Sequence, residues 1–144
     1  MKPQTYANHR RYVPLFHFVT FGLIVVTLIG SIVNVMASLG NHQRIYSASL
    51  LMAVCVILLF MFFFMRSFAV KVQDRAIRAE ENLRHFARTG RLLDPRLTMR
   101  QVIGLRFASD DEFIDLARRA VEEGLGEEEI KRAIRSWRPD HHRA

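Results

Sequence analysis

Two long stretches without a charged residue constrain this chain more than any other feature. Residues 12–43 and residues 45–65 contain no Asp, Glu, Lys or Arg. A helix needs about 20 consecutive apolar residues to cross a hydrocarbon layer of ~30 Å, and both stretches reach that length. The sequence therefore predicts two transmembrane helices, over residues 15–39 and residues 45–65.

The link between the two predicted spans is short and polar. It consists of residues 40–44, with the sequence GNHQR. Backbone groups in lipid must be bonded within the helices, so a link of this length makes the spans an antiparallel hairpin over residues 15–65. A cleaved signal peptide is the rival interpretation, but the apolar region of a signal peptide is only about 7–15 residues long.

The distribution of charge predicts the orientation of the hairpin. The chain carries 21 Lys and Arg against 14 Asp and Glu, and every acidic residue follows residue 73. The link has one basic residue, whereas the two outer flanks have seven: Lys2, Arg10, Arg11, Arg66, Lys71, Arg75 and Arg78. Cytoplasmic flanks of membrane proteins are rich in Lys and Arg. Both termini are therefore expected in the cytoplasm, with residues 1–14 as a basic flank.

A polar stripe follows one face of the first predicted span. Its members are three, four or seven residues apart: Thr20, Thr27, Ser31, Asn34 and Ser38. Small and hydroxyl residues at this spacing are typical of a seam between membrane helices. A conduit for ions usually needs ionisable groups at depth, and neither span contains Asp or Glu. We therefore predict a helix-packing seam, with Asn34 facing another helix.

The second predicted helix continues beyond the membrane as a stalk over residues 66–90, ended by Gly90. Its apolar residues follow a heptad pattern: Ala69, Val72, Ala76, Ala79, Leu83 and Phe86. Such a seam requires burial, either by a second copy or by the chain's own C-terminal part, and the pattern leaves both open. Other faces carry two acid-first pairs at four-residue spacing, Asp74 with Arg78 and Glu80 with Arg84.

Residues 91–144 are predicted to form a small cytoplasmic unit of three helices. Thr98 opens the first helix, and Ser109 with Glu112 has the spacing of a capping box that opens the second. Gly124 ends the second helix, and the third runs over residues 127–137. The complete expectation is an all-α protein with a membrane hairpin, a stalk and this small unit.

The small unit is expected to dock a protein rather than nucleic acid. Its last helix opens with three glutamates at residues 127–129, which would repel the phosphates that a helix-turn-helix domain approaches. Three aromatic residues, Phe107, Phe113 and Trp137, are expected to supply a small core or an exposed docking anchor.

Sequence motifs for catalysis are absent. There is no HExxH, GxSxG or glycine-rich phosphate loop, and the one cysteine, Cys55, cannot form a zinc pair. The pairs Asp110-Asp111 and His141-His142 are read as a helix cap and a terminal segment rather than metal sites. We expect no enzyme activity, no cofactor, no metal and no small-molecule substrate.

Several segments together resemble a family of small bacterial membrane proteins classed as a domain of unknown function. They are NHRRYVPL at residues 8–15, GSIVN at 30–34, QDRAIRAEEN at 73–82, LTMRQ at 97–101 and LRFASDDEF at 105–113. The resemblance implies a bacterial inner-membrane protein with two spans and a cytoplasmic tail. It carries over no activity, cofactor or catalytic residue.

Two classes of function fit these observations. The first is a membrane-anchored interaction or scaffold subunit, which contacts lipid through its spans and a protein partner or a second copy through its cytoplasmic part. The alternative is an accessory subunit of a transporter or respiratory membrane complex, in which the polar stripe packs against a larger membrane protein.

Overall fold

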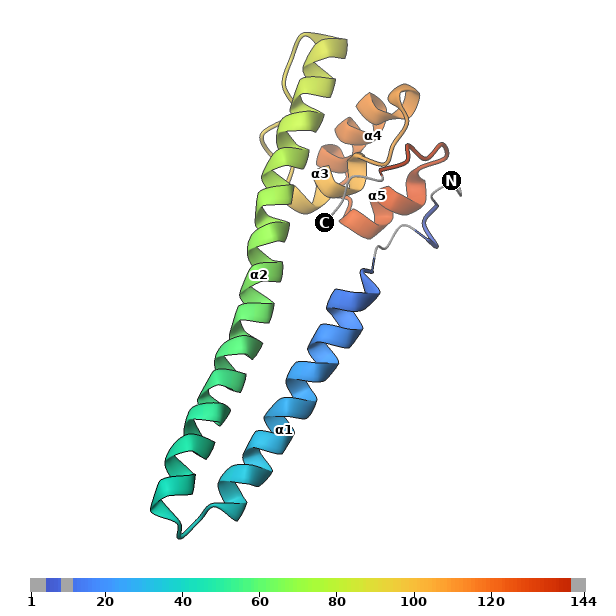
Figure 1. Cartoon of the computed structure of the whole chain (residues 1–144). Helices are drawn as coiled ribbons and strands as arrows, with labels where there is room; N and C mark the ends of the chain where they lie inside the picture. The colour runs from blue at the N-terminus through green and yellow to red at the C-terminus, as the bar shows by residue number, and fades with distance from the viewer. Residues whose placement is uncertain (1–4, 9–11, 141–144) are drawn as a thin grey trace. The chain divides into compact units, whose positions relative to one another are not determined.

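The computed structural model describes residues 5–8 and 12–140, so the expectations for Lys2, Arg10, Arg11, His141 and His142 lie outside the described residues. These described segments form a π-helical turn and five α-helices, with one isolated bridge and no β-strand (Figure 1). The predicted all-α class is confirmed. The chain divides into two compact units, which we call the hairpin unit (Tyr12–Phe68) and the tail unit (Met1–Arg11 with Ala69–Ala144).

The hairpin unit begins with a wide helical turn. The π-helix η1 covers Leu15–Thr20 and leads directly into α1, Phe21–Ala37. The Thr20 hydroxyl donates to the Leu15 carbonyl five residues earlier, at 2.9 Å, which fits the wider π-helical turn. The sequence predicted a single helix ending at residue 39, and the structure ends it two residues earlier.

A tight turn connects α1 to α2, His42–Thr89. Gly40 adopts a φ of 88°, a left-handed conformation that glycine tolerates without steric cost. The Asn41 side-chain oxygen then accepts the Arg44 N–H at 3.2 Å, which caps the start of α2 three residues before the predicted span. The two helices run antiparallel, as the short link predicted (Figure 1).

Contact within the hairpin unit uses small side chains and one aromatic stack. The fully buried residues are small: Ser31, Ser38, Ala48 and Cys55. The rings of Phe16 and Phe62 stack with their centroids 4.4 Å apart. Small residues let two helix backbones approach closely, which is the usual mode of helix association in membranes.

Helix α2 continues without interruption through the predicted span and the predicted stalk. It is 48 residues long, more than twice the ~20 residues that cross a membrane. Gly90 ends it as predicted, with a φ of 71° and its N–H donating to the Phe86 carbonyl at 2.8 Å. The C-terminal part of α2 belongs to the tail unit.

Three short helices complete the tail unit: α3, Met99–Leu105, α4, Asp110–Glu122, and α5, Glu127–Ala133. The predicted cap of α3 is confirmed, because Thr98 and Gln101 exchange two hydrogen bonds, at 2.8 and 3.3 Å. The predicted capping box at Ser109 is wrong. The Glu112 carboxylate instead accepts the N–H groups of Arg135 and Ser136, at 3.1 and 3.0 Å, and so joins α4 to the C-terminal segment.

The last predicted helix is shorter than expected. Helix α5 ends at Ala133, whereas the sequence predicted that it would reach Trp137. Ile134 is extended, and the chain after it pairs with the segment before α4, since the Arg138 N–H donates to the Phe107 carbonyl at 2.8 Å. Backbone bonds to another segment replace the last helical turns.

Helices α3 and α5 approach closely at Gly104. A Cβ atom added there would lie 3.1 Å from the Glu127 carbonyl oxygen and 3.2 Å from an Ile130 methyl carbon. The side chains of Val102, Leu105 and Ile130 are fully buried around this contact. The absence of a side chain at residue 104 therefore sets the distance between the two helices.

Candidate interaction surface

A buried cluster of charges joins α2 to the rest of the tail unit. Glu81 and Arg84 lie one helical turn apart on α2, and their side chains are only 5% and 10% exposed. The Arg84 Nη1 atom lies 2.9 Å from a Glu81 carboxylate oxygen. The other Glu81 oxygen lies 3.5 Å from Arg138, beyond α5. The buried carboxylate thus contacts one cation on its own helix and one from a distant segment.

Arg84 also contacts the segment that opens α4, through hydrogen bonds and a ring contact. It donates to the Asp110 carboxylate at 2.8 Å and to the Ala108 carbonyl at 2.7 Å, both in the segment that opens α4. Its guanidinium carbon also lies 4.1 Å from the centroid of the Phe113 ring. The planar fork of arginine suits several simultaneous hydrogen bonds and ring stacking, which lysine could not reproduce.

Asp110 receives two arginines from α2. Arg84 and Arg88 each approach its carboxylate at 2.7 Å. Their hydrogen bonds, first that of Arg84 and then that of Arg88, lower the pKa of the Asp110 carboxyl below its ordinary value. The sequence analysis read Asp110 as part of a helix cap. In the structure it is the first residue of α4, after the N-cap Ser109, and its ion pairs with Arg84 and Arg88 anchor α4 to α2.

A groove with a volume of about 490 Å³ lies beside this cluster. Its charged lining is balanced, with three acids and three arginines: Glu80, Glu81, Asp140, Arg84, Arg106 and Arg138. Arg106 is 9% exposed, lies 3.3 Å from Asp140 and covers the Phe107 ring at 4.6 Å. Balanced charges of this kind favour ion pairing within the fold over capture of a ligand of one sign.

The sequence-predicted ion pairs on α2 differ from those in the structure. Glu80 was expected to pair with Arg84, but Arg84 turns to Glu81 and Asp110. Arg78 was expected to pair with Asp74, but its guanidinium donates to the Leu97 carbonyl at 3.0 Å. Residues from the tail compete for both arginines, and spacing along a helix does not report such distant partners.

The heptad pattern of α2 lies on an exposed face. We call its six residues the exposed α2 seam: Ala69, Val72, Ala76, Ala79, Leu83 and Phe86. All six are exposed, and the side chains of Val72 and Leu83 are both 68% exposed. Ile77 and Glu81, on the other side of the helix, are buried against the tail helices. Within the tail unit, the chain's own helices therefore leave this seam uncovered.

The predicted aromatic residues of the tail belong mainly to its core. Phe107 and Phe113 are fully buried, so they serve the core and leave no docking anchor. Trp137 is half-buried, with its ring centroid 5.0 Å from that of Phe107. Of the three residues, only Trp137 also presents part of its ring to solvent.

Tyr6, near the N-terminus, contacts helix α5 of the tail unit. The Tyr6 hydroxyl donates to a Glu128 carboxylate oxygen at 2.7 Å. Arg132, one turn later on α5, lies with its guanidinium carbon 5.5 Å from the centre of the Tyr6 ring. A residue near the N-terminus therefore lies on the surface of α5, a contact that the sequence analysis missed.

The polar stripe of α1 divides into two groups. Ser31 and Ser38 are buried within the hairpin unit. Thr20 and Thr27 are exposed, and their hydroxyls donate to carbonyls of the same helix. The Asn34 side chain is also exposed, so no helix of the described chain covers it. The prediction that Asn34 faces another helix then requires a helix from another chain.

Side chains that could bind a metal ion do not form a cluster in the described part of the chain. Among residues 5–8 and 12–140, no three His, Cys, Asp or Glu side chains lie together in an arrangement that could hold a metal ion.

The residues that sequence analysis missed are those whose partners are far away in the chain. Glu81 and Tyr6 stand in patterns typical of a solvated surface, and Arg84 was assigned only its helix neighbour Glu80 as a partner. One signal was present for Glu81. It occupies the helix face of Ile77, and a lone apolar residue among charges can indicate a second packed face.

Comparison with known proteins places the chain in a family. The family of unknown function DUF6526 matches residues 1–144. The chain belongs to DUF6526. This membership confirms the resemblance to a family of unknown function that the sequence segments indicated. No curated protein and no solved structure matches this DUF6526 chain.

Proposed function

We propose that this DUF6526 chain is an integral membrane protein that anchors a small helical interaction unit at the cytoplasmic face of a bacterial inner membrane. It acts as a scaffold or interaction subunit rather than an enzyme. The hairpin unit fixes the chain in lipid, and the tail unit presents surfaces to a protein partner.

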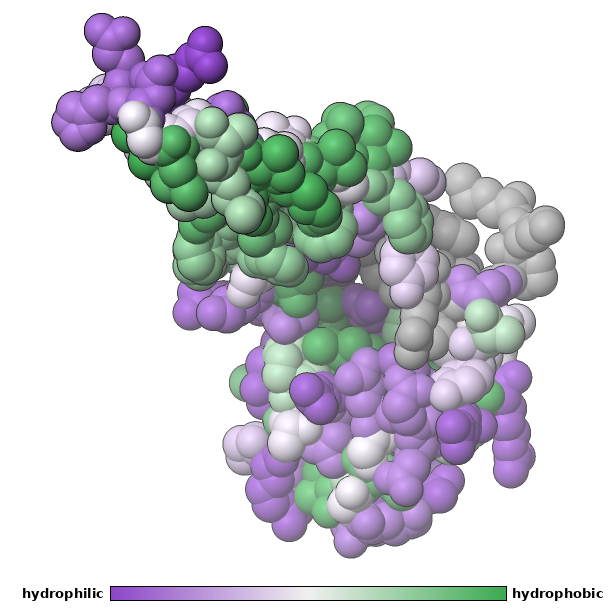
Figure 2. All heavy atoms as spheres, turned by 90° about the horizontal axis from the view of Figure 1, so that it is seen from below, coloured by the Kyte–Doolittle hydropathy of each residue, from purple (hydrophilic) through white to green (hydrophobic). Residues whose placement is uncertain are grey.

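One observation carries the membrane assignment. The segments Leu15–Ala37 and His42–Thr89 are long and apolar enough to cross a membrane, and only 6% and 17% of their most apolar windows is buried. A core helix of a soluble protein would be mostly buried. Apolar side chains instead cover the outside of the hairpin unit, whereas hydrophilic residues dominate the visible surface of the tail helices (Figure 2). Such an apolar surface is stable in lipid and not in water.

The contact of Tyr6 with α5 supports an arrangement with both ends on one side of the membrane. Tyr6 precedes both spans and Glu128 follows them, yet their side chains are hydrogen-bonded at 2.7 Å. Two antiparallel spans return the chain to its starting side, and the excess of Lys and Arg in the outer flanks makes that side the cytoplasm.

Site-specific cysteine labelling tests this topology. Cys55 is the one cysteine, so a Cys55→Ala background allows single cysteines at Gln43 in the turn region and at Arg100 in the tail. In intact cells, an impermeant maleimide should label Gln43→Cys, and should label Arg100→Cys only after the membrane is opened. Labelling of Arg100→Cys in intact cells, or release of the protein by alkaline carbonate, would refute the proposal.

The accessory-subunit role remains the second candidate, because exposed Asn34 suggests a helix from another chain against α1. Purification in mild detergent followed by mass determination distinguishes the two roles. A larger membrane protein that remains bound in fixed ratio would favour the accessory subunit.

A further inference from the structure

The exposed α2 seam is an apolar face on which the helices of the tail unit do not pack. The tail helices pack on the side of α2 that carries Ile77 and Glu81, both less than 10% exposed. The opposite side keeps Leu83 at 68% and Phe86 at 51% exposure. The sequence left open whether the chain's own tail or a second copy covers the seam. Because the chain's own tail packs on another face of α2, the second copy is left as the candidate.

We propose that the exposed α2 seam pairs with the same seam of a second copy, in a parallel, in-register two-helix coiled coil. This inference rests on the proposed membrane anchoring, because copies inserted in the same orientation have α2 helices that point in the same direction. Parallel helices with a heptad repeat of apolar residues supercoil around that seam.

The charged residues beside the seam fit this arrangement. With Ala69, Ala76 and Leu83 at heptad position a, Arg75 falls at position g and Glu80 at position e. The remaining e and g positions between residues 69 and 89 are uncharged: Gln73, Asn82, Ala87 and Thr89. In a parallel pair, a g residue meets the e residue five positions later in the other helix. Arg75 of each copy therefore meets Glu80 of the other.

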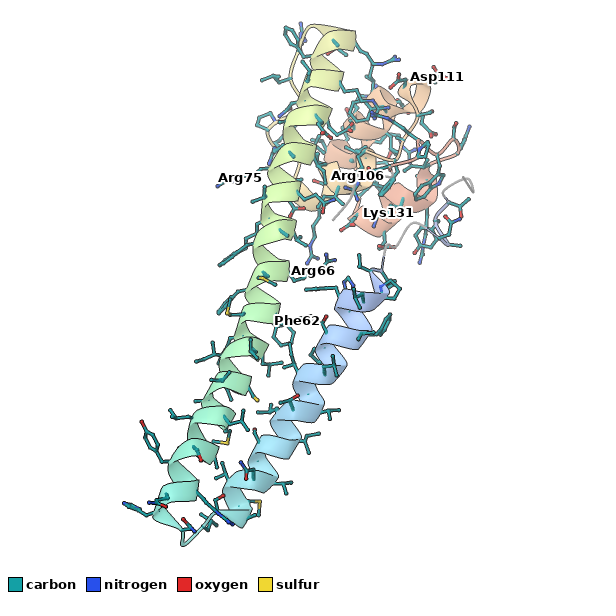
Figure 3. The ribbon with its side chains drawn as sticks, in the orientation of Figure 1. Phe62, Arg66, Arg75, Arg106, Asp111 and Lys131 are labelled. Carbon is teal, nitrogen blue, oxygen red and sulfur yellow. The ribbon has the colours of Figure 1, made fainter. Side chains whose placement is uncertain are left out.

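These two charges also select the register. A slip by one heptad would place Arg75 opposite Gln73 or Ala87, and both ion pairs would be lost. Within the described part of the tail unit, neither Arg75 nor Glu80 forms an ion pair, and both side chains are exposed. Arg75 lies on the side of α2 away from α3, α4 and α5 (Figure 3). Arg75 is thus available to a second copy. Glu80 lines the edge of the groove beside the charge cluster, but its side chain stays exposed and can also reach a second copy.

The pairing is expected to be weak in solution and effective in the membrane. Three of the six seam residues are alanines, which bury little apolar surface, and three heptads are near the lower limit for a coiled coil. Anchoring in one membrane raises the effective concentration of the second copy, so modest contacts suffice.

Disulfide crosslinking in native membranes tests the inference. In the Cys55→Ala background, Ala76→Cys and Ala79→Cys place a thiol on the seam, whereas Lys71→Cys places one on an exposed position of the same helix away from it. A disulfide requires Cα atoms within about 7 Å. Mild oxidation should therefore convert the two seam variants into dimers several-fold faster than Lys71→Cys.

Equal rates for the seam and control variants would overturn the pairing, as would crosslinking of the seam mainly to a different protein. Both results leave the membrane anchoring intact if carbonate extraction and maleimide labelling succeed. Failure of those two assays instead refutes the proposed function, whatever the crosslinking shows.

Charge reversal tests the register. Arg75→Glu alone and Glu80→Arg alone each place like charges together across the interface, so each should slow crosslinking of Ala79→Cys. The double variant restores opposite charges and should recover the rate. A double variant as slow as the single variants would refute the in-register arrangement.

Discussion

Replacement of Arg84 by methionine is expected to unfold the tail unit while it leaves the hairpin in the membrane. Methionine keeps an apolar side chain of similar length against Phe113. It removes the guanidinium that contacts Glu81 at 2.9 Å, Asp110 at 2.8 Å and the Ala108 carbonyl at 2.7 Å. The substitution therefore tests the charge cluster rather than the packing volume.

The size of the effect follows from burial. The Glu81 side chain is only 5% exposed, and without Arg84 its remaining ion-pair partner is Arg138 at 3.5 Å. Removal of one partner of a buried ion pair costs about 3–5 kcal/mol, because the other charge stays desolvated. A small domain has only about 5 kcal/mol of stability at the low end, so most of it would be lost. Arg84→Lys keeps one charge but loses the fork, and should have a smaller effect.

Intrinsic fluorescence provides the assay. Trp137 is the one tryptophan of the chain and lies in the tail unit, so its emission reports the unfolding of that unit alone. With a urea dependence of about 1 kcal/mol per M, the midpoint should fall by about 3–5 M in detergent-solubilised full-length protein. Arg100→Met is the matched control, since the Arg100 side chain is exposed on α3.

The urea midpoint of the control variant is the reference for the Arg84→Met result. Arg100→Met should unfold at the wild-type urea concentration, because exposed charges contribute about 0–1 kcal/mol. If Arg84→Met and Arg100→Met had the same midpoint, the buried charge cluster would not hold the tail helices to α2.

Three further predictions concern separate parts of the molecule. Asn34→Leu should weaken self-association in mild detergent by about 0.6–2 kcal/mol, whereas Val26→Leu should leave it unchanged, as measured by analytical ultracentrifugation; equal behaviour would place Asn34 against lipid. The pKa of Asp110 is lowered from 3.8 in the folded state, so its contribution to stability is present above that value and is lost as pH falls through the folded pKa. Asp110→Asn should therefore lower the tryptophan-detected stability by about 0.5–1 kcal/mol at neutral pH and weaken its dependence on acid. Gly104→Ala should cost about 1–3 kcal/mol in the same urea assay, because its methyl group would lie 3.1 Å from a carbonyl oxygen of α5; wild-type stability would show that α3 and α5 can move apart.

The helices were predictable because their signals are local. Uncharged runs mark the two apolar helices, and Gly90 ends α2 where the sequence placed the end. Thr98 and Gln101 form the expected cap because both residues lie within one turn. Each of these features depends on residues close together in the chain, so a pattern in the sequence is sufficient to find it.

The packing of the tail was not predictable in the same way. The heptad pattern predicted that other helices would pack on the apolar face of α2, yet the tail packs on the face that carries Glu81 and Arg84. The pairing of Arg84 with Asp110 joins residues 26 positions apart, and no helical spacing encodes such a partner. The end of α5 depended likewise on a distant partner, because the N–H groups of residues 135 and 136 donate to the Glu112 carboxylate. Distant partners outweighed local helix propensity at both places.

The contact between Tyr6 and Glu128 has a consequence for the order of events during synthesis. The tail unit is discontinuous in the chain, since its residues come from both sides of the hairpin unit. Tyr6 emerges from the ribosome first, and its partner on α5 is made 122 residues later. In the proposed membrane arrangement, the second span must return the chain to its starting side before this contact can form. In that arrangement, a chain that inserted only one of the two spans would leave Tyr6 and α5 on opposite sides of the membrane, so the completed tail unit distinguishes insertion of the whole hairpin from insertion of a single span.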